Sequence, residues 1–301
     1  MSIDSAATET TARTDARTER RALLAGVPIR EERVTLAGLS TAVLVGGEGP
    51  PLVLLHGPGE SAVNWRWTIP DLVRTHRVVA PDLPAHGGTE SPDAVDERAV
   101  LDWLEALVEG MCSSAPVLVG HVLGGSLAAR YAARRRTGPA GLVLVDSLGL
   151  SRFRPSLRFL LTLVGFQVRP TEWTYEMFMG QCAYDRDALR DRMGGLWSRF
   201  ARYNLDLARG PKSRMAGRLL RSLGLPRIPS EELERIEVPT ALIWGRHDRA
   251  TSVEVARTAS HRYGWPLHVV EEAADDPPRD RPEAFVRALR SILTAPPFAA
   301  A

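Results

Sequence analysis

The sequence has few cysteines, a single lysine and no long apolar run. Cys112 and Cys182 lie far apart and outside any Cys-x-x-Cys spacing, which favours two reduced thiols over a disulfide. No segment approaches the roughly 20 apolar residues that a membrane span needs. The first 25 residues lack the apolar run of about seven residues that a secretory signal contains. These absences predict a cytoplasmic protein.

Charge is also nearly balanced, since 38 basic and 36 acidic residues leave a net charge of +2. Neither nucleic acid nor a membrane is therefore predicted as a partner, and the oligomeric state is left open. Lys212 is the only lysine, a bias from which no function follows. With 44% hydrophobic residues, the 301-residue chain has the composition of an ordinary globular protein, either one large α/β domain with an insertion or two small domains.

Short apolar runs alternate with helical patterns from residue 30 onward. The runs lack polar alternation, as strands buried on both faces of a parallel sheet do. A hairpin, Glu32–Val45, leads into them. The other predicted strands are Leu52–Leu55, Arg77–Ala80, Val117–Val119, Leu142–Val145, Ala241–Trp244 and Leu267–Val270. The predicted helices are Ser61–Val73, Ala94–Glu109, Leu123–Arg136, Val253–Arg262 and Pro282–Leu293. This order predicts an α/β fold with a mostly parallel sheet of about eight strands.

Residues 148–236 interrupt this rhythm with helical patterns and ten of the chain's nineteen aromatic residues. An insertion at this point predicts a helical cap over the carboxyl edge of the sheet, where ligands bind in such folds. Most of its aromatics are expected to pack the cap itself. Residues 30–147 and 237–301 are then the core. Residues 1–29 are predicted to be a flexible arm or a loosely docked helix.

Three loops carry a family resemblance. His56-Gly57-Pro58-Gly59, Gly120-His121-Val122-Leu123-Gly124 and Trp244-Gly245-Arg246-His247-Asp248 each follow a predicted strand. Their order resembles that of the α/β-hydrolase superfamily, in its capped, epoxide-hydrolase- and esterase-like branch. The resemblance implies that these loops carry the oxyanion hole, the nucleophile and the catalytic acid. Pro81-Asp82-Leu83-Pro84-Ala85-His86-Gly87 matches a further loop of the family.

The nucleophile position departs from that pattern, because it holds Val122, whose side chain has no atom that can attack a carbonyl. A β-branched residue at the positive φ of an elbow costs on the order of 1–3 kcal/mol. The elbow has therefore either relaxed or kept its strain for another reason.

The general base is missing too. The family's histidine lies in the loop after the last strand, and the flanking prolines put Asp275 at its place. Pro58, where the loop should donate an oxyanion N–H, has none. Gly59 is a substitute if the loop is shifted. Serine-type ester hydrolysis is therefore not expected.

The candidate catalytic residues are Asp248, Asp275 and His121. Asp248 and Asp275 are predicted to face each other and to share a proton, because close like charges raise one pKa. The competing interpretation is that Asp248 caps local backbone amides and Asp275 points to solvent. His86 is a second candidate base. The predicted substrate contacts are His56, Gly57, Gly59, Val122, Leu123, Trp173 and Tyr175.

Ser61 is predicted to cap a helix and Ser126 to be a buried packing residue. No metal-ligand spacing appears, so neither a metal nor a cofactor is predicted.

Three functions stay open. The first is a cofactor-free enzyme that acts on a small apolar or aromatic substrate by lyase, isomerase, cyclase or carboxylate-assisted chemistry. The second is a catalytically silent protein that binds a small ligand. The third is an ordinary ester, lactone or epoxide hydrolase whose triad is misaligned. The first is preferred because the loops that form the pocket look intact while the inherited chemistry does not.

Overall fold

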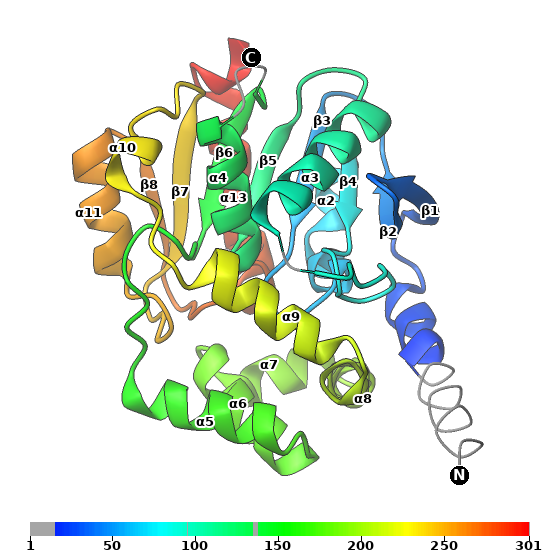
Figure 1. Ribbon diagram of the computed structural model, residues 1–301. Coiled ribbons are helices and arrows are strands. Elements are labelled where there is room, and N and C mark those ends of the chain that lie inside the picture. The colour runs from blue at the N-terminus through cyan, green and yellow to red at the C-terminus, as the bar shows by residue number, and fades with distance from the viewer. Residues whose placement is uncertain (1–15, 95, 135–137, 301) are drawn as a thin grey trace.

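The computed structural model describes residues 16–94, 96–134 and 138–300 (Figure 1). The predicted α/β fold is confirmed as a single eight-stranded sheet in the order β1-β2-β4-β3-β5-β6-β7-β8. The strands are β1 Arg30–Leu36, β2 Leu39–Gly46, β3 Pro51–Leu55, β4 Arg77–Pro81, β5 Val117–His121, β6 Gly141–Val145, β7 Thr240–Gly245 and β8 Leu267–Val270. The β1–β2 hairpin pairs Arg30 with Val45, and β2 joins β4 antiparallel. All other neighbours are parallel.

Two layers of helices cover the sheet, and a third group lies over its carboxyl edge (Figure 1). On one face, apolar side chains of α3, α4 and α11 pack on the strands, and on the other those of η1, α2 and α13 do. These helices are η1 Ala62–Trp67, α2 Ile69–Leu72, α3 Glu97–Met111, α4 Leu123–Arg134, α11 Val253–Tyr263 and α13 Pro282–Thr294; α12 Pro277–Asp280 and η3 Phe298–Ala300 are short. None of the helices in the described part of the chain is long and apolar enough to cross a membrane.

The helix predicted over Ser61–Val73 is broken in the structure. A 3-10 helix, η1, ends at Trp67, and the four-residue α2 follows it. Pro70 lies in the first turn of α2, where its lack of an N–H prevents a hydrogen bond back to the last turn of η1. Ser61 caps η1 by accepting a hydrogen bond from the Val63 N–H at 3.3 Å, which confirms its predicted role.

The region between β6 and β7 is helical, as the cap prediction requires. It contains α5 Leu157–Val168, α6 Glu172–Cys182, α7 Arg186–Met193, α8 Leu196–Arg209, α9 Ser213–Leu219, η2 Leu220–Gly224 and α10 Ser230–Leu233. Aromatic and aliphatic side chains from Phe159 to Leu207 form a core of their own. Leu219, Leu223 and Leu233 instead pack with α4 and the sheet. The last part of the interval therefore belongs structurally to the α/β core.

The N-terminal arm is more ordered than predicted over the part that the structure describes. Residues 16–24 form a helix, and Leu23 is fully buried among the cap residues. The Arg20 guanidinium is buried between the core and the cap, 3.1 Å from the Asp82 carboxylate and 3.0 Å from the Tyr203 hydroxyl. Of the two alternatives left open, a docked helix describes residues 16–24, while residues 1–15 lie outside the described part.

Replacing Arg20 tests how much this docking contributes. Arg20→Ala leaves the Asp82 carboxylate buried without its cation, although the Ala62 and Gly88 N–H groups still donate to it. We expect a loss of about 3–5 kcal/mol in the free energy of unfolding, measured by urea denaturation. The exposed neighbour is the control, since Arg21→Ala should change stability by less than about 0.5 kcal/mol. Equal effects of the two substitutions would contradict a docked helix.

Candidate functional site

The elbow after β5 keeps the strained backbone that a nucleophile would need. Val122 has a φ of 47°, in the left-handed region that β-branched residues avoid. Its N–H donates to the Val145 carbonyl at 2.9 Å, and its carbonyl accepts from Ser126 and Leu148. A Cβ at Gly120 would lie 2.5 Å from the Gly124 carbonyl oxygen, so only glycine fits there. The turn has therefore not relaxed, and it presents a hydrocarbon side chain.

The loop after β3 is fixed by hydrogen bonds of its own. His56 Nδ1 donates to the Gly57 carbonyl at 2.7 Å, and Nε2 accepts from the Leu83 N–H at 2.9 Å. Burial lowers the His56 pKa, so the ring is neutral and holds two loops together. The Gly57 N–H donates to the Glu60 carboxylate at 2.9 Å, whereas Gly59 lies exposed with a φ of 73°. No N–H of this loop replaces the one that Pro58 lacks, because Gly57 is engaged and Gly59 faces outward.

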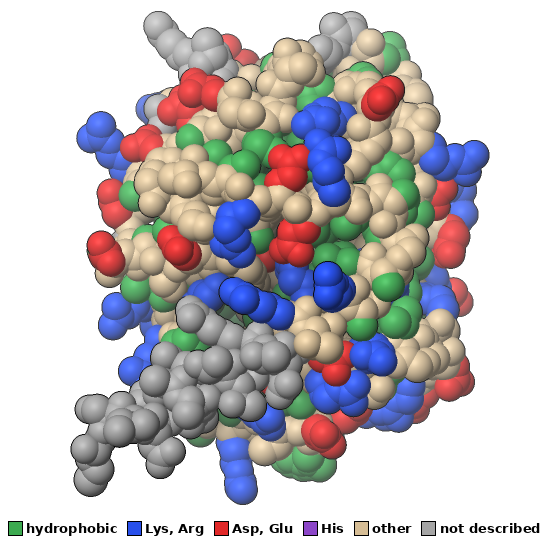
Figure 2. Space-filling model, turned by 90° about the vertical axis from the view of Figure 1, so that its right-hand side faces the viewer, with side chains coloured by type: hydrophobic (Ala, Val, Ile, Leu, Met, Phe, Trp, Pro, Cys, Tyr) green, Lys and Arg blue, Asp and Glu red, His purple; other side chains and the backbone are tan. Residues whose placement is uncertain are grey.

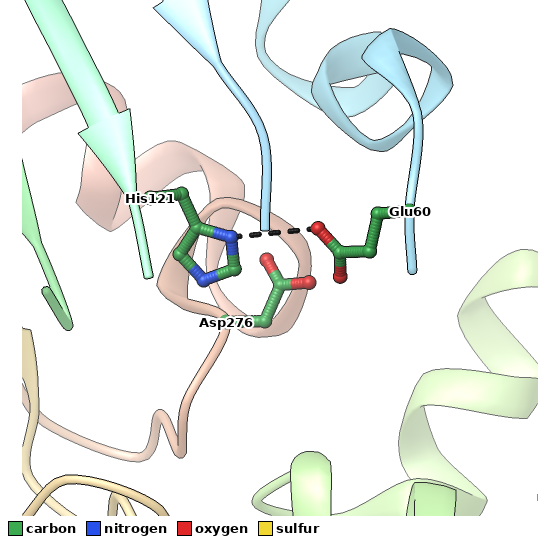
Figure 3. Close-up of side chains that lie close together, drawn as sticks. All are labelled: Glu60, His121 and Asp276. Carbon is green, nitrogen blue, oxygen red and sulfur yellow. Dashed lines mark ion pairs between the residues drawn. The ribbon is translucent and has the colours of Figure 1, made fainter. Parts of the chain in front are cut away.

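His121 joins this loop to the one after β8. Its Nε2 donates to the Asp275 carbonyl at 2.7 Å, and its Nδ1 lies 3.6 Å from the Glu60 carboxylate. Figure 3 shows the ring at the end of β5, facing Glu60 and beside Asp276. The loops after β3, β5 and β8, which carry the oxyanion hole, the nucleophile and the histidine in the resembled family, thus meet at one imidazole.

Charge within this cluster is balanced by the chain's own groups. Burial would lower the His121 pKa, but Asp276 and Glu60 raise it to about 9. Burial would raise the Glu60 pKa, but His121 lowers it to about 2. Burial raises the Asp276 pKa to about 6 against the effect of Arg279, whose guanidinium lies 3.0 Å away. His121 is therefore an imidazolium paired mainly with Glu60, while Arg279 faces Asp276.

Glu60, His121 and Asp276 have ligand atoms close enough together to surround a cation. His121 donates through Nε2 to a backbone carbonyl, an orientation that also suits a metal ligand, but Asp276 and Glu60 raise its pKa to about 9, so a metal would have to displace a proton from Nδ1. Arg279 already supplies positive charge to Asp276. These features disfavour a metal here, and the absence of a metal stays a prediction.

A second group of carboxyls, those of Asp146, Asp248 and Asp275, lies near the elbow and, among the described residues, has no basic side chain hydrogen-bonded to it. Asp248 Oδ1 accepts from the N–H groups of Ala250 and Thr251 at 2.7 and 2.8 Å, which is the capping role that the competing interpretation gave it. Its Oδ2 is buried without a hydrogen-bond partner, as are Asp146 Oδ2 and Asp275 Oδ1. Asp275 is partly exposed. The predicted pair is therefore a group of three.

The pKa values of these three carboxyls are all raised. Burial raises the Asp248 pKa to about 7 against the two backbone hydrogen bonds. Burial, and then the charge of Asp248, raise the pKa of both Asp146 and Asp275. The side chains of Asp146 and Asp248 interact directly, so one proton between them satisfies both. Near neutral pH the group therefore holds both a proton and a negative charge.

Sequence reasoning missed two members of this region. Asp146 directly follows β6 at the carboxyl edge, so the argument that singled out Asp248 would have found it. The Cys182 thiol, from the end of α6, interacts with the Asp275 carboxyl, and burial, followed by that carboxyl, raises its pKa. Nothing in the sequence around Cys182 indicates this contact. The raised pKa keeps the sulfur protonated and weakly nucleophilic.

The other predicted residues differ in burial and in their contacts. Tyr175 is buried, and its hydroxyl accepts a hydrogen bond from Asn204 at 3.4 Å. Trp173 is 71% exposed, which corrects its prediction as a pocket residue. Burial lowers the His86 pKa to about 3, and its Nδ1 donates to the Pro84 carbonyl at 2.9 Å, so it holds its own loop. Ser126 is buried and donates to the Leu223 carbonyl at 2.7 Å, as expected of a packing residue.

A surface hollow with a volume of about 450 Å³ lies near Asp248. It borders Ala250 and Thr251, whose amides hold Asp248. The remaining lining comes from Ser147 to Arg154, Arg227, Ser252, Val255 and Thr258. Val122, Leu123 and Tyr175 do not line it. The elbow is instead covered, since Val122 is only 9% exposed.

Comparisons with known proteins agree with this architecture. A model described as the alpha/beta hydrolase family matches residues 52–288. A 2-hydroxy-6-oxo-2,4-heptadienoate hydrolase from Pseudomonas putida is 27% identical over 87% of this chain and 96% of its own. A 2-hydroxymuconate semialdehyde hydrolase from Pseudomonas sp. is 32% identical over 54% of this chain and 58% of its own. The structure of a meta-cleavage product hydrolase from Pseudomonas fluorescens superposes with a TM-score of 0.75 at 24% identity, over 89% of this chain and 99% of that one, which shows the fold alone.

The pH dependence of stability tests the two clusters. The Glu60 pKa is lowered from 4.5, so its contribution is complete above pH 4.5 and disappears as the pH falls toward 2. The His121 pKa is raised from 6.5 to about 9, so its contribution is complete below pH 6.5 and disappears as the pH rises through 9. The raised Asp248 pKa acts over a lower range, because its contribution is complete below pH 3.8 and disappears as the pH rises through 7. We expect maximal stability near pH 4.5 and a decline from there to pH 9 in urea titrations.

His121→Gln is the matched variant for this measurement. It removes the titrating imidazole but keeps an amide that can donate to the Asp275 carbonyl. The decline between pH 7 and 9 should become shallower, while the loss caused by Asp248 between pH 4 and 7 should persist. A wild-type free energy of unfolding that rises from pH 6.5 to 9 would contradict the assigned charges.

Proposed function

Because the chain belongs to the alpha/beta hydrolase family, we propose that it is an enzyme of that family that transfers protons without a covalent intermediate. The observation that carries this proposal is the group of three carboxyls, Asp146, Asp248 and Asp275, each with one oxygen buried without a hydrogen-bond partner, beside an elbow that presents Val122. Such a group supplies an acid and a base at neutral pH. The hydrocarbon at the elbow supplies no nucleophile.

The roles follow from the surroundings of each carboxyl. Asp275 is partly exposed, keeps its proton because its pKa is raised by burial and by the charge of Asp248, and is the acid that contacts substrate. Asp248, held by two backbone amides beside Asp146, carries the negative charge and is the base. The elbow presents Val122 in place of a nucleophile, and the hydroxyls of Ser126 and Ser147 are engaged, since they donate to the carbonyls of Leu223 and Leu148. An ordinary ester, lactone or epoxide hydrolase is therefore disfavoured.

The names of the relatives suggest a substrate class. The heptadienoate hydrolase acts on a compound whose name describes an enol conjugated to a ketone. Converting such an enol to its keto form moves one proton from oxygen to carbon and breaks no carbon–carbon bond. One base and one acid suffice for that step, with no co-reactant. We therefore infer isomerisation of a small enolic keto acid, with Asp248 accepting the hydroxyl proton and Asp275 donating to carbon.

A catalytically silent ligand-binding protein is the second candidate. The ion pair of His121 and the low exposure of Val122 favour it over the enzyme, because they leave little space for a reacting substrate at the elbow, and a ligand would then occupy the hollow beside Ala250 and Thr251. Incubation of the protein with a 2-hydroxydienoate, followed by NMR of the products, separates the two functions. Binding without proton exchange at carbon in deuterated buffer would identify a silent binder.

Replacing the carboxyls tests the enzyme. Asp275→Asn and Asp248→Asn should each slow the decay of enol absorbance by about 100- to 10,000-fold, as expected for the loss of a general base or acid. The rate should respond to a group with a pKa near that of Asp248, about 7. Glu254→Gln, which removes an exposed carboxylate on α11, is the control and should be unchanged. Asparagine variants with full activity would refute these roles.

Restoring the family's nucleophile and base tests the alignment. The wild-type chain should not hydrolyse p-nitrophenyl acetate above background. Val122→Ser with Asp275→His should introduce measurable esterase activity and labelling by a serine-directed reagent, because the elbow backbone is already at a φ of 47°. Val122→Ser alone is the control and should gain much less. Labelling of a serine in the wild-type chain would instead support an ordinary serine hydrolase.

A further inference from the structure

One helix of the cap presents an apolar stripe to solvent. Among the described residues, the large hydrophobic side chains that are exposed all lie on α5 or at the start of α6. They are Leu157 (70% exposed), Leu160 (41%), Leu161 (64%), Val164 (47%), Val168 (79%) and Trp173 (71%). Their spacing on α5 is that of a single helical face. These six residues are called the α5 face below.

The other side of α5 is firmly attached to the cap. Phe159 is buried against Phe178, with ring centroids 5.6 Å apart, and Phe166 stacks on Phe178 and contacts Tyr175. α5 therefore needs no further partner to be folded. Its outward stripe is surplus to the cap's own packing, and exposed apolar patches of this kind mark interaction sites.

Basic residues surround the α5 face. Arg152, Arg154, Arg158 and Arg169 are all exposed, and the only acidic residue between Ser151 and Trp173 is Glu172. This local excess contrasts with the net charge of +2 for the whole chain. It also contrasts with the face seen in Figure 2, where Lys and Arg are interspersed with Asp and Glu. An apolar stripe bordered by arginines is complementary to a surface that is apolar inside and anionic at its rim.

We propose that the α5 face docks reversibly on an anionic lipid bilayer, with α5 lying in the interface and the arginines on the headgroups. Helices with Leu and Trp on one face and basic residues beside it bind bilayers in this way. Anionic headgroups add about fivefold in affinity for each basic residue near the surface. The net charge of the whole chain predicted no membrane partner, but binding to a bilayer depends on the local charge around the α5 face, where the arginines are concentrated.

A second copy of the chain fits the α5 face less well. A two-fold interface places the same patch on both subunits, so it would bring two arginine borders together. Glu172 is the only carboxylate between Ser151 and Trp173 that could oppose them. Like charges across an interface disfavour association, whereas anionic headgroups pair with every arginine.

Vesicle flotation with the full chain tests the proposal. We expect binding to phosphatidylcholine vesicles that contain phosphatidylglycerol, little binding to phosphatidylcholine alone, and release at high salt. Leu161→Ser with Val164→Ser should weaken binding by about tenfold or more, because it removes buried apolar area. Both positions are solvent-exposed, and circular dichroism checks that the variants are folded.

A charge-matched pair isolates the role of the arginines. Arg154→Glu with Arg158→Glu should reduce binding at least about 25-fold, following the fivefold effect of each basic residue. Arg98→Glu with Arg287→Glu changes the net charge equally but on α3 and α13, and should leave binding nearly unchanged. Equal effects of the two pairs would overturn the proposal, as would equal binding to neutral vesicles.

Light scattering after size-exclusion chromatography tests whether a second copy of the chain occupies the α5 face. A monomer, or an oligomer unaffected by Leu161→Ser with Val164→Ser, supports a lipid-facing surface. A dimer that this double substitution dissociates would overturn the proposal, because the α5 face would then be an interface between copies.

Discussion

The site is organised by one buried imidazolium. His121 donates to the Asp275 backbone, faces the Glu60 carboxylate and lies beside Asp276, so the loops after β3, β5 and β8 share a single cation. A buried charge of this kind persists only when its partners are in place. The positions of Glu60 and of the Asp275 backbone are therefore linked to the protonation of a residue adjacent to the elbow tip. The strained φ of Val122 is kept in the same region by backbone hydrogen bonds to β6 and α4.

The two sides of the elbow differ electrostatically. On the His121 side, Glu60 and Asp276 are matched by an imidazolium and by Arg279. On the other side, Asp146 and Asp248 lie together without a nearby cation among their hydrogen-bond partners, so a proton takes that role. Matched charges stabilise a scaffold, whereas a shared proton is available for transfer. This contrast is why the Asp248 side, and not the histidine, is the reactive part of the proposed enzyme.

Much of the fold could be predicted from the sequence because buried parallel strands are continuous apolar runs and their loops have fixed positions. The hairpin, the strand order of the motifs and the N-cap at Ser61 follow from local patterns. The break between η1 and α2 occurs at Pro70, and the apolar pattern of Ser61–Val73 did not predict it. Arg20, Cys182 and Trp173 were misjudged or missed because their surroundings come from segments distant in sequence. Tertiary contacts bury Arg20 beside Asp82 and Cys182 beside Asp275, and they leave Trp173 outside.

The cap is fastened to the core on two opposite sides. Arg20 links Tyr203 to Asp82 on one side. On the other, the Asp280 carboxylate accepts from the Tyr184 N–H, and Arg192 donates to the backbone carbonyls of Arg279 and Asp280. Lifting the cap away from the core would break both sets of contacts. The hollow next to Ala250 and Thr251 involves none of them, so we expect a ligand to approach Asp248 from there while the cap stays in place.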